Sequence, residues 1–140
     1  MGCGHTAVAI VASGYGINKN PYECFQQSPT LTTSMKKMGL KVTELGAFPK
    51  AGDIGTNYPT LTQAQQEQVI QHLKGGNPVI IYVIKKLGSI YTSSQHYMAL
   101  LDVSSDGSKV WVSDPADTYN GWNSTTKVFK GAIGAKLVSK

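Results

Sequence analysis

The spacing of apolar residues changes from a helical period to a strand period between the two halves of the chain. Near the start, Cys3, Ala7, Ile10 and Gly14 fall at i, i+4, i+7 and i+11, on one stripe of a helix. We therefore predict a largely buried helix that carries Cys3 in its first turn and ends at glycine. A thiol in that position lies beside unpaired N–H groups and the positive end of the helix dipole, and both favour the thiolate.

Three more helices are predicted in the first half from their start and stop signals. A polar cap, a proline in the first turn or a Glu or Gln three residues after the cap marks a start, and glycine marks an end. The signals are Asn20-Pro21-Tyr22-Glu23, Ser28-Pro29 with Gly39 as the stop, and Thr62 with Gln65 ahead of Gly75-Gly76. Residues 40–45 are expected to form a short edge strand, and residues 46–59, which are rich in Gly and Pro, are expected to form a loop.

The second half of the chain is typical of antiparallel strands. Residues 79–84 are a continuous apolar run, which predicts a central strand. Residues 95–103 and 109–113 predict two strands joined by a hairpin at Ser105-Asp106-Gly107, and residues 125–129 predict a fourth. Helices followed by strands indicate an α+β fold with the two kinds of element in separate layers, and 140 residues suit one domain.

Composition and charge narrow the class of partner. The sequence is 41% hydrophobic and 15% charged, which is typical of a globular domain. The net charge is +5, but all 13 basic residues are lysine, so no arginine is present for bidentate contacts to phosphates or bases. We expect no nucleic-acid partner, whereas an anionic polymer surface is compatible with the charge. No apolar run reaches the length of a membrane span.

Three polar residues stand at the ends of otherwise apolar elements. Cys3 heads the first helix, His96 opens one strand of the hairpin and Asp114 closes the other. A cysteine nucleophile needs a base, and the base needs an orienting partner, so Cys, His and Asp together predict a catalytic triad. Asp102 and Asp117 are the alternatives to Asp114, but Asp102 lies about 20 Å along the strand and Asp117 falls in a loop.

The length of the hairpin loop decides whether His96 and Asp114 share a face of the sheet. A two-residue Asp106-Gly107 turn would direct Asp114 away from His96, whereas a three-residue loop, Ser105-Asp106-Gly107, places both on one face. Three-residue loops favour glycine in the third, left-handed position, so we predict this loop with positive φ at Gly107. We also expect an Asp114 oxygen within about 2.6–3.2 Å of a His96 ring nitrogen.

An ordered set of short motifs resembles one family of enzymes. The motifs are Cys3-Gly4-x-Thr6-Ala7, Gly76-x-Pro78-Val79-Ile80, His96-Tyr97, and Val112-Ser113-Asp114-Pro115 followed by Gly121-Trp122. Over nearly the whole chain they resemble the C39-like branch of the papain-like cysteine peptidases. The resemblance implies a single domain over residues 1–140 with the papain-like fold, in which the N-terminal helix packs on an antiparallel sheet. It also implies that Cys3 is the nucleophile, His96 the general base and Asp114 its orienting acid.

Two positions depart from the family pattern. The family usually has proline where this chain has His5. It also usually has a glutamine a few residues before the cysteine that helps to bind the oxyanion, whereas only Met1 and Gly2 precede Cys3 here. Without that glutamine, the Cys3 backbone N–H and one unidentified donor would remain to bind the oxyanion. Because the sequence opens almost directly on this motif, without a signal-type leader, we expect it to be a fragment of a longer chain with other domains.

The remaining candidate residues have simpler interpretations. His5 is two residues past Cys3, roughly 200° around the helix, and is expected at the surface or rim; His72 is expected to be solvated on an amphipathic helix. A zinc site from Cys3, His5, Cys24 and His72 lacks the close paired spacing of such sites and is not expected. A disulfide between Cys3 and Cys24, which would abolish nucleophilicity, stays open. The aromatic residues Trp111, Trp122 and Tyr97 are expected in the core, and Trp122 could instead form a wall of a substrate groove.

These observations lead us to expect a cysteine peptidase or amide hydrolase that acts on a peptide without a cofactor or metal. Bacterial cell-wall peptides or secreted peptides are the expected substrates, and a secreted or cell-wall-associated location is expected. Two alternatives stay open. One is a leader-peptide-processing peptidase attached to an exporter, and the other is a non-catalytic binding domain of the same fold.

Overall fold

The computed structural model describes residues 3–50, 57–116 and 119–140. Its centre is a six-stranded sheet in the order β1-β6-β2-β3-β4-β5, and every neighbouring pair is antiparallel. The strands are β1 Lys41–Gly46, β2 Val79–Ile84, β3 Gln95–Val103, β4 Lys109–Ser113, β5 Gly121–Ser124 and β6 Ala132–Ser139. The helices are α1 Cys3–Ser13, α2 Pro21–Gln27, α3 Leu31–Lys37, α4 Gln63–Lys74 and α5 Thr125–Phe129, with a short 3-10 helix, η2, at Lys85–Leu87.

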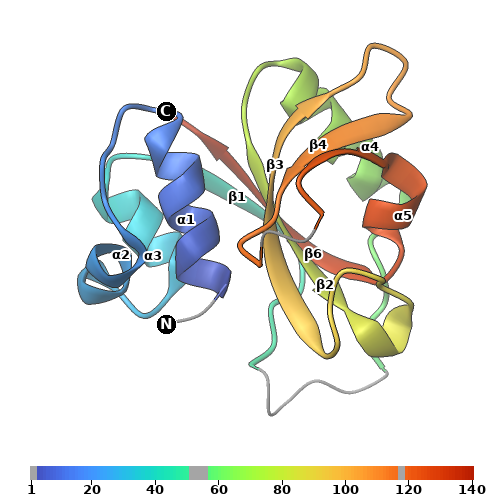
Figure 1. Cartoon of the computed structure of the whole chain (residues 1–140), viewed down its shortest axis with the longest axis horizontal. Helices are drawn as coiled ribbons and strands as arrows, with labels where there is room; N and C mark the ends of the chain where they lie inside the picture. The colour runs from blue at the N-terminus through green and yellow to red at the C-terminus, as the bar shows by residue number, and fades with distance from the viewer. Residues whose placement is uncertain (1–2, 51–56, 117–118) are drawn as a thin grey trace.

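The helices form two groups on opposite sides of the sheet (Figure 1). Helices α1, α2 and α3 lie on one side, and α4 and α5 lie on the other. The predicted α+β architecture, with the first helix packed on an antiparallel sheet, is confirmed. No helix in the described parts of the chain is both long enough and apolar enough to span a bilayer.

Strand β2 is buried along its whole length, because helices cover part of both faces and residues such as Phe48 cover Tyr82 and Ile84. Ile81 and Val83 belong to the apolar core that includes α4, whereas Ile80 belongs to the core that includes α1. Alternate residues of a strand point to opposite faces, so a strand between two helical layers needs apolar residues at every position. This explains the unbroken apolar run of residues 79–84.

The capping boxes begin their helices where the sequence indicates. The Asn20 side chain accepts a hydrogen bond from the Glu23 N–H at 2.8 Å, and the Glu23 carboxylate accepts one from the Asn20 N–H at 3.0 Å. Thr62 and Gln65 form the same reciprocal pair at the start of α4. Each box satisfies two N–H groups that have no partner within the helix.

The prediction of a strand at residues 125–129 is wrong, because this segment is the helix α5. Val128 and Phe129 are both buried in the core on the α4 side. Neighbouring residues of a strand would point to opposite faces, so only a helical turn lets both side chains enter one core. The strand that pairs with β4 is instead β5, just before this helix.

The sequence pattern also gave no sign of β6, which lies between β1 and β2. It contains three small residues, Ala132, Gly134 and Ala135, and the buried Lys136, so it lacks the alternating apolar pattern of a strand. Gly134 has no room for a side chain, because a Cβ there would lie 2.4 Å from the Ala47 carbonyl oxygen. Close approach of neighbouring chain segments therefore selects small residues in this strand.

Candidate active site

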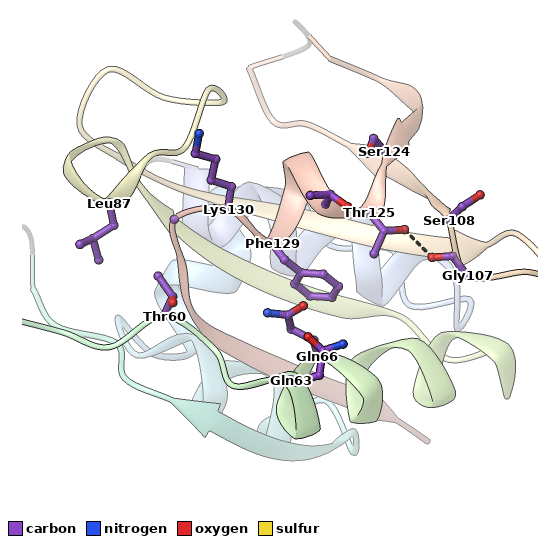
Figure 2. A pocket seen from close by; sticks show the side chains of 12 residues that line it. Thr60, Gln63, Gln66, Leu87, Gly107, Ser108, Ser124, Thr125, Phe129 and Lys130 are labelled. Carbon is purple, nitrogen blue, oxygen red and sulfur yellow. Dashed lines mark hydrogen bonds between the residues drawn. The ribbon is translucent and has the colours of Figure 1, made fainter.

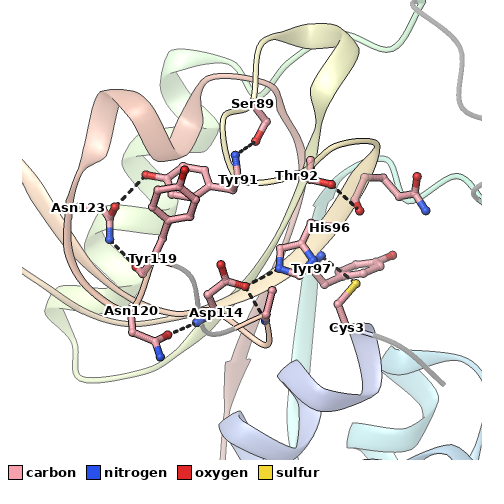
Figure 3. A network of polar contacts seen from close by, with 12 residues as sticks. Cys3, Ser89, Tyr91, Thr92, His96, Tyr97, Asp114, Tyr119, Asn120 and Asn123 are labelled. Atoms are coloured by element: carbon pink, nitrogen blue, oxygen red, sulfur yellow. Dashed lines mark hydrogen bonds and ion pairs between the residues drawn. The ribbon is translucent and has the colours of Figure 1, made fainter.

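Cys3 is the first described residue of α1, and the helix places its thiol against the sheet (Figure 3). The Cys3 Sγ accepts a hydrogen bond from the Tyr97 backbone N–H at 3.4 Å. Tyr97 follows His96 on β3, so this contact brings the start of α1 to the start of that strand. The predicted position of the cysteine in the first turn of the helix is confirmed.

His96 and Asp114 form a buried pair beside the thiol. The His96 Nε2 lies 2.6 Å from the Asp114 Oδ1, and these residues are only 8% and 4% exposed. Because Nε2 faces the carboxylate, Nδ1 is the ring nitrogen left for its hydrogen bond with Cys3. The predicted distance between His96 and Asp114 is confirmed, whereas the catalytic roles of the three residues stay a prediction.

Backbone and amide contacts hold the Asp114 carboxylate in place. Its Oδ1 also accepts a hydrogen bond from the Ala116 N–H at 2.8 Å, and the Asp114 N–H donates to the Asn120 Oδ1 at 2.7 Å (Figure 3). Among the described residues, the buried Asp114 Oδ2 has no hydrogen-bond partner. The contacts of Oδ1 with His96 and the Ala116 N–H, together with the hydrogen bond from the Asp114 N–H to Asn120, therefore hold the carboxylate in its orientation toward His96.

The hairpin that carries this pair differs from the predicted three-residue loop. The Ser104 N–H donates to the Lys109 carbonyl oxygen at 2.9 Å, so the loop consists of the four residues 105–108. The Asp106 carboxylate accepts hydrogen bonds from the hydroxyl groups of Ser104 and Ser108, both at 2.8 Å. These contacts hold Ser108 in the loop, outside the pairing of the two strands. Gly107 has φ of +77°, which confirms the predicted left-handed conformation.

A β-bulge, which the sequence analysis did not foresee, corrects the register. Next to the loop, Asp102 pairs with Trp111. On the other side of Leu101 the next pair is Leu100 with Val112, so Leu101 has no partner and the register is shifted by one residue. Continuing the shifted pairing places Asp114 on the face of His96. Without the bulge, the pairing set by the four-residue loop would direct the carboxylate to the opposite face.

The electrostatics of the pair favour a thiolate beside an imidazolium. Burial raises the pKa of Cys3, but hydrogen bonds from His96 and the Tyr97 N–H, with the positive charge of His96, leave it below its ordinary value. Burial alone would lower the pKa of His96, but hydrogen bonds to Cys3 and Asp114, with their negative charges, leave it raised. Each group therefore stabilises the charged form of the other.

A groove of about 530 Å³ opens at Cys3. Part of it is a row of stacked rings: Tyr97 lies 4.3 Å from Tyr82 between ring centroids, and Tyr82 lies 6.3 Å from Phe48. Burial raises the pKa of Tyr82 to about 12, so this ring is neutral at physiological pH. The residues that line the groove are Cys3, Gly4, His5, Pro29, Thr30, Leu31, Glu44, Phe48, Pro49, Lys50, Tyr82, Gln95, Tyr97 and Lys136.

A larger cavity of about 700 Å³ shares no lining residue with this groove (Figure 2). It lies among α4, α5, the loop of the β3–β4 hairpin and η2, and amide and hydroxyl side chains such as Gln63, Gln66 and Thr125 face it. The described residues that line it include no Cys, His, Asp or Glu, whereas the smaller groove contains the Cys3 thiol.

Two predictions about histidine need correction, one of them in part. His5, expected at the surface or rim, does line the groove at Cys3, but it is buried. Its Nε2 lies 3.0 Å from the Ser28 carbonyl oxygen, and its ring packs edge-on against Phe25. His72 is half-buried, with Nε2 2.7 Å from the Val138 carbonyl oxygen, rather than solvated.

Both cysteines are free. Cys24 is buried in the core between α1 and α3, and burial raises its pKa. No group of three or more His, Cys, Asp or Glu residues in the described parts of the chain is arranged to hold a metal ion.

The two tryptophans are not in the core. Trp111 and Trp122 are 40% and 48% exposed and pack edge-to-face at 5.5 Å, and neither lines the groove at Cys3. Tyr97 is half-buried at the groove. The sequence did not indicate that the Tyr97 backbone N–H donates a hydrogen bond to the Cys3 thiol, because no side-chain pattern can reveal a backbone contact. Sequence reasoning also missed Asn120, whose place in the Asp-Pro loop six residues after Asp114 was the only available signal.

Comparison with known proteins identifies the class of protein to which this site belongs. The peptidase domain of Streptococcus ComA, described as a bifunctional ABC transporter involved in quorum sensing, aligns with a TM-score of 0.66 and 18% identity over 98% of this chain and 90% of its own. A Bacillus anthracis protein described as a C39-like peptidase aligns with a TM-score of 0.63 and 13% identity, over 99% of this chain and 89% of its own. No curated protein matches the sequence.

The fold is therefore that of C39 peptidase domains. The sequence profile of the Peptidase C39 like family matches residues 1–133, and the chain belongs to this family.

Proposed function

We propose that the protein is a cysteine peptidase in which Cys3 is the nucleophile, His96 the general base and acid, and Asp114 the orienting carboxylate. The observation that carries the proposal is the buried contact of 2.6 Å between His96 and Asp114, with the remaining ring nitrogen of His96 available to a thiol at the start of α1. A nucleophile, a base and a group that orients the base are the three parts that acyl transfer through cysteine requires.

The reaction proposed has two steps. The Cys3 thiolate attacks the carbonyl carbon of the scissile peptide bond, and the protonated His96 gives its proton to the leaving amine, which forms a thioester. His96 then takes a proton from water, whose oxygen attacks the thioester. The carbon–sulfur bond breaks, the acid product leaves, and the Cys3 thiolate remains beside the protonated His96. The Cys3 backbone N–H, at the helix start, is the oxyanion donor that the described residues supply to the tetrahedral species.

We propose bacterial cell-wall or secreted peptides as substrates, at a secreted or cell-wall-associated location. The support is the charge of +5 without arginine, which suits an anionic polymer surface better than nucleic acid. The resemblance of the fold to the peptidase domain of ComA supports a second candidate, the processing of leader peptides beside an exporter.

Incubation with a mixture of synthetic peptides, followed by mass spectrometry, tests the proposal. The protein should produce cleaved peptides, and Cys3→Ala and His96→Ala should not, while both variants keep the thermal unfolding temperature of the wild type within a few degrees. A wild-type protein that binds peptides and leaves them intact would instead indicate a non-catalytic binding domain.

A further inference from the structure

A buried lysine in the groove has all of its hydrogen-bonding capacity used within the protein. Lys136 on β6 lies directly opposite Glu44 on β1 and is only 3% exposed. Its Nζ forms an ion pair with the Glu44 Oε2, donates to the Thr32 Oγ1 at 2.8 Å, and lies 3.9 Å from the centre of the Phe48 ring. Since an ammonium group has three donors, these three partners leave none for a ligand.

Glu44 differs from Lys136 because half of it faces the outside. Its side chain is 46% exposed, and Oε2 accepts hydrogen bonds from Lys136 and from Thr32, the latter at 2.7 Å. Among the described residues, Oε1 has no hydrogen-bond partner. The hydrogen bond from Lys136 is the main cause that lowers the pKa of Glu44, so the carboxylate is ionised at neutral pH.

Glu44 also belongs to the same groove as the reactive thiol. Both Glu44 and Cys3 line it. Burial is the main cause that raises the pKa of Tyr97, whose backbone N–H contacts the Cys3 Sγ, and the negative charge of Glu44 adds to that rise. A peptide bound with its scissile bond at Cys3 would therefore extend past a fixed carboxylate with one free oxygen.

We propose that Glu44 determines specificity by binding a positively charged amine of the peptide, such as a lysine or diamino-acid side chain, through its free Oε1. This inference rests on the proposed function and adds the class of substrate. An amine is favoured over a neutral donor because a hydrogen bond between two charged groups is about twice as strong. Lys136 and Thr32 hold the carboxylate in one orientation, so little side-chain freedom is lost on binding.

Lys50 is the other charged side chain that needs to be considered in the groove. It is exposed and forms no ion pair with any acid among the described residues, so nothing holds its ammonium group in one position. Its positive charge would favour an acidic peptide instead of a basic one. Substitution of Lys50 therefore provides the matched control for substitution of Glu44.

The test uses a cleaved peptide with lysine, norleucine or glutamate substituted at each position on both sides of the scissile bond. Norleucine has nearly the shape of lysine without its charge. At one position we expect the wild type to prefer lysine over norleucine about fivefold in kcat/KM, as a single partly exposed charge pair allows. Glu44→Gln should remove that preference, and Lys50→Gln should leave it. Equal effects of Glu44→Gln on all three peptides, or a preference for glutamate that depends on Lys50, would overturn the inference.

A second variant and a binding measurement separate this inference from the fold and from the proposed function. Glu44→Gln with Lys136→Met removes both charges, avoids an unpaired buried lysine, and should lose the preference in the same way. If no peptide is cleaved, fluorescence anisotropy with Cys3→Ala protein replaces the kinetics. The lysine peptide should then bind several times more tightly than the norleucine peptide, and only while Glu44 is present. Equal affinities, or no binding of either peptide, would refute the role of Glu44.

Discussion

His96 and Asp114 lie on the same face of the sheet because a β-bulge keeps Leu101, an extra residue of strand β3, out of the regular pairing. The pairs next to the loop and the pairs next to the site differ in register by one residue, and the bulge absorbs the difference. The bulge in β3 therefore determines the face toward which the Asp114 side chain, at the end of β4, is directed. The distance of 2.6 Å between the His96 Nε2 and the Asp114 Oδ1 therefore depends on Leu101 staying outside the regular pairing.

Deletion of Leu101 should preserve the site. The deletion removes the extra residue but leaves the pairs on both sides of it in their present register, so Asp114 stays on the face of His96. Leu101 is 39% exposed, so little core packing is lost. We expect the rate of Cys3 alkylation to depend on pH as in the wild type. A profile that matches Asp114→Ala would show that the strand has slipped and that the bulge has a further role.

The charge state of Cys3 can be measured directly by alkylation with iodoacetamide across a range of pH. Because hydrogen bonds and the charge of His96 lower the pKa of Cys3, the thiolate should persist below the free-cysteine value of about 8.5 and be lost only as pH falls through the lowered pKa. In His96→Ala the inflection should move up toward the free value. The same inflection in both proteins, close to the free value, would contradict the thiolate–imidazolium pair.

Much of this site follows from local sequence signals, since helix caps, an apolar run and a glycine at a turn are fixed by neighbouring residues. The position of Cys3 at the start of α1 and the left-handed Gly107 belong to this group. The face on which Asp114 lies was predicted correctly but from a loop length that is wrong. A bulge depends on the fit between two strands, and no residue of one strand alone reveals it.

The errors in the rest of the fold have the same origin. Residues 125–129 contain β-branched residues that favour a strand, but burial of both Val128 and Phe129 in one core requires a helix. Strand β6 was missed because its alanine and glycine residues are selected by close neighbours, and because Lys136 obtains its partners from β1 and α3. Long-range contacts therefore decide both segments.

Removal of the Asp114 carboxylate should reduce turnover and change its pH dependence. The negative charge and hydrogen bond of Asp114 help to raise the pKa of His96, so in Asp114→Ala that pKa should fall. The imidazolium would then be lost at lower pH, and the alkaline limb of kcat/KM should shift in that direction. We expect kcat to fall by about 10²-fold or more, on the scale of other triads. Asp114→Asn, which keeps a side chain that can orient His96 but has no charge, serves as the control. Its kcat should lie between those of the wild type and Asp114→Ala.

The two cysteines should react at very different rates. Cys24 is 0% exposed and burial raises its pKa, whereas Cys3 is partly exposed with a lowered pKa. A limiting amount of iodoacetamide at neutral pH should therefore modify Cys3 alone, which peptide mapping by mass spectrometry would show. Cys24→Ala provides the matched variant and should be labelled at the wild-type rate. Rapid modification of Cys24, or protection of both thiols until a reductant is added, would contradict the free and buried state of this residue.

The ion pair between Glu44 and Lys136 gives a final prediction about stability. Glu44→Ala leaves a buried ammonium group without its counter-charge, and we expect the free energy of unfolding near neutral pH to fall by about 2 kcal/mol, less than for a fully buried pair because Glu44 is half-exposed. Lys136→Met replaces the lysine with an apolar side chain of similar length, and its effect should stay within about 1 kcal/mol.

The pH dependence of that difference distinguishes a charge effect from lost packing. Because the folded pKa of Glu44 is lowered, its contribution is present above the unfolded value of about 4.3 and is lost as pH falls through the lowered pKa. Urea unfolding of the wild type and Glu44→Ala should therefore converge in acid, where the wild type also has an uncompensated Lys136. Burial lowers the pKa of Lys136, so the curves should also approach each other in alkali as the amine becomes neutral. A constant difference across this range would assign the effect to packing instead of charge.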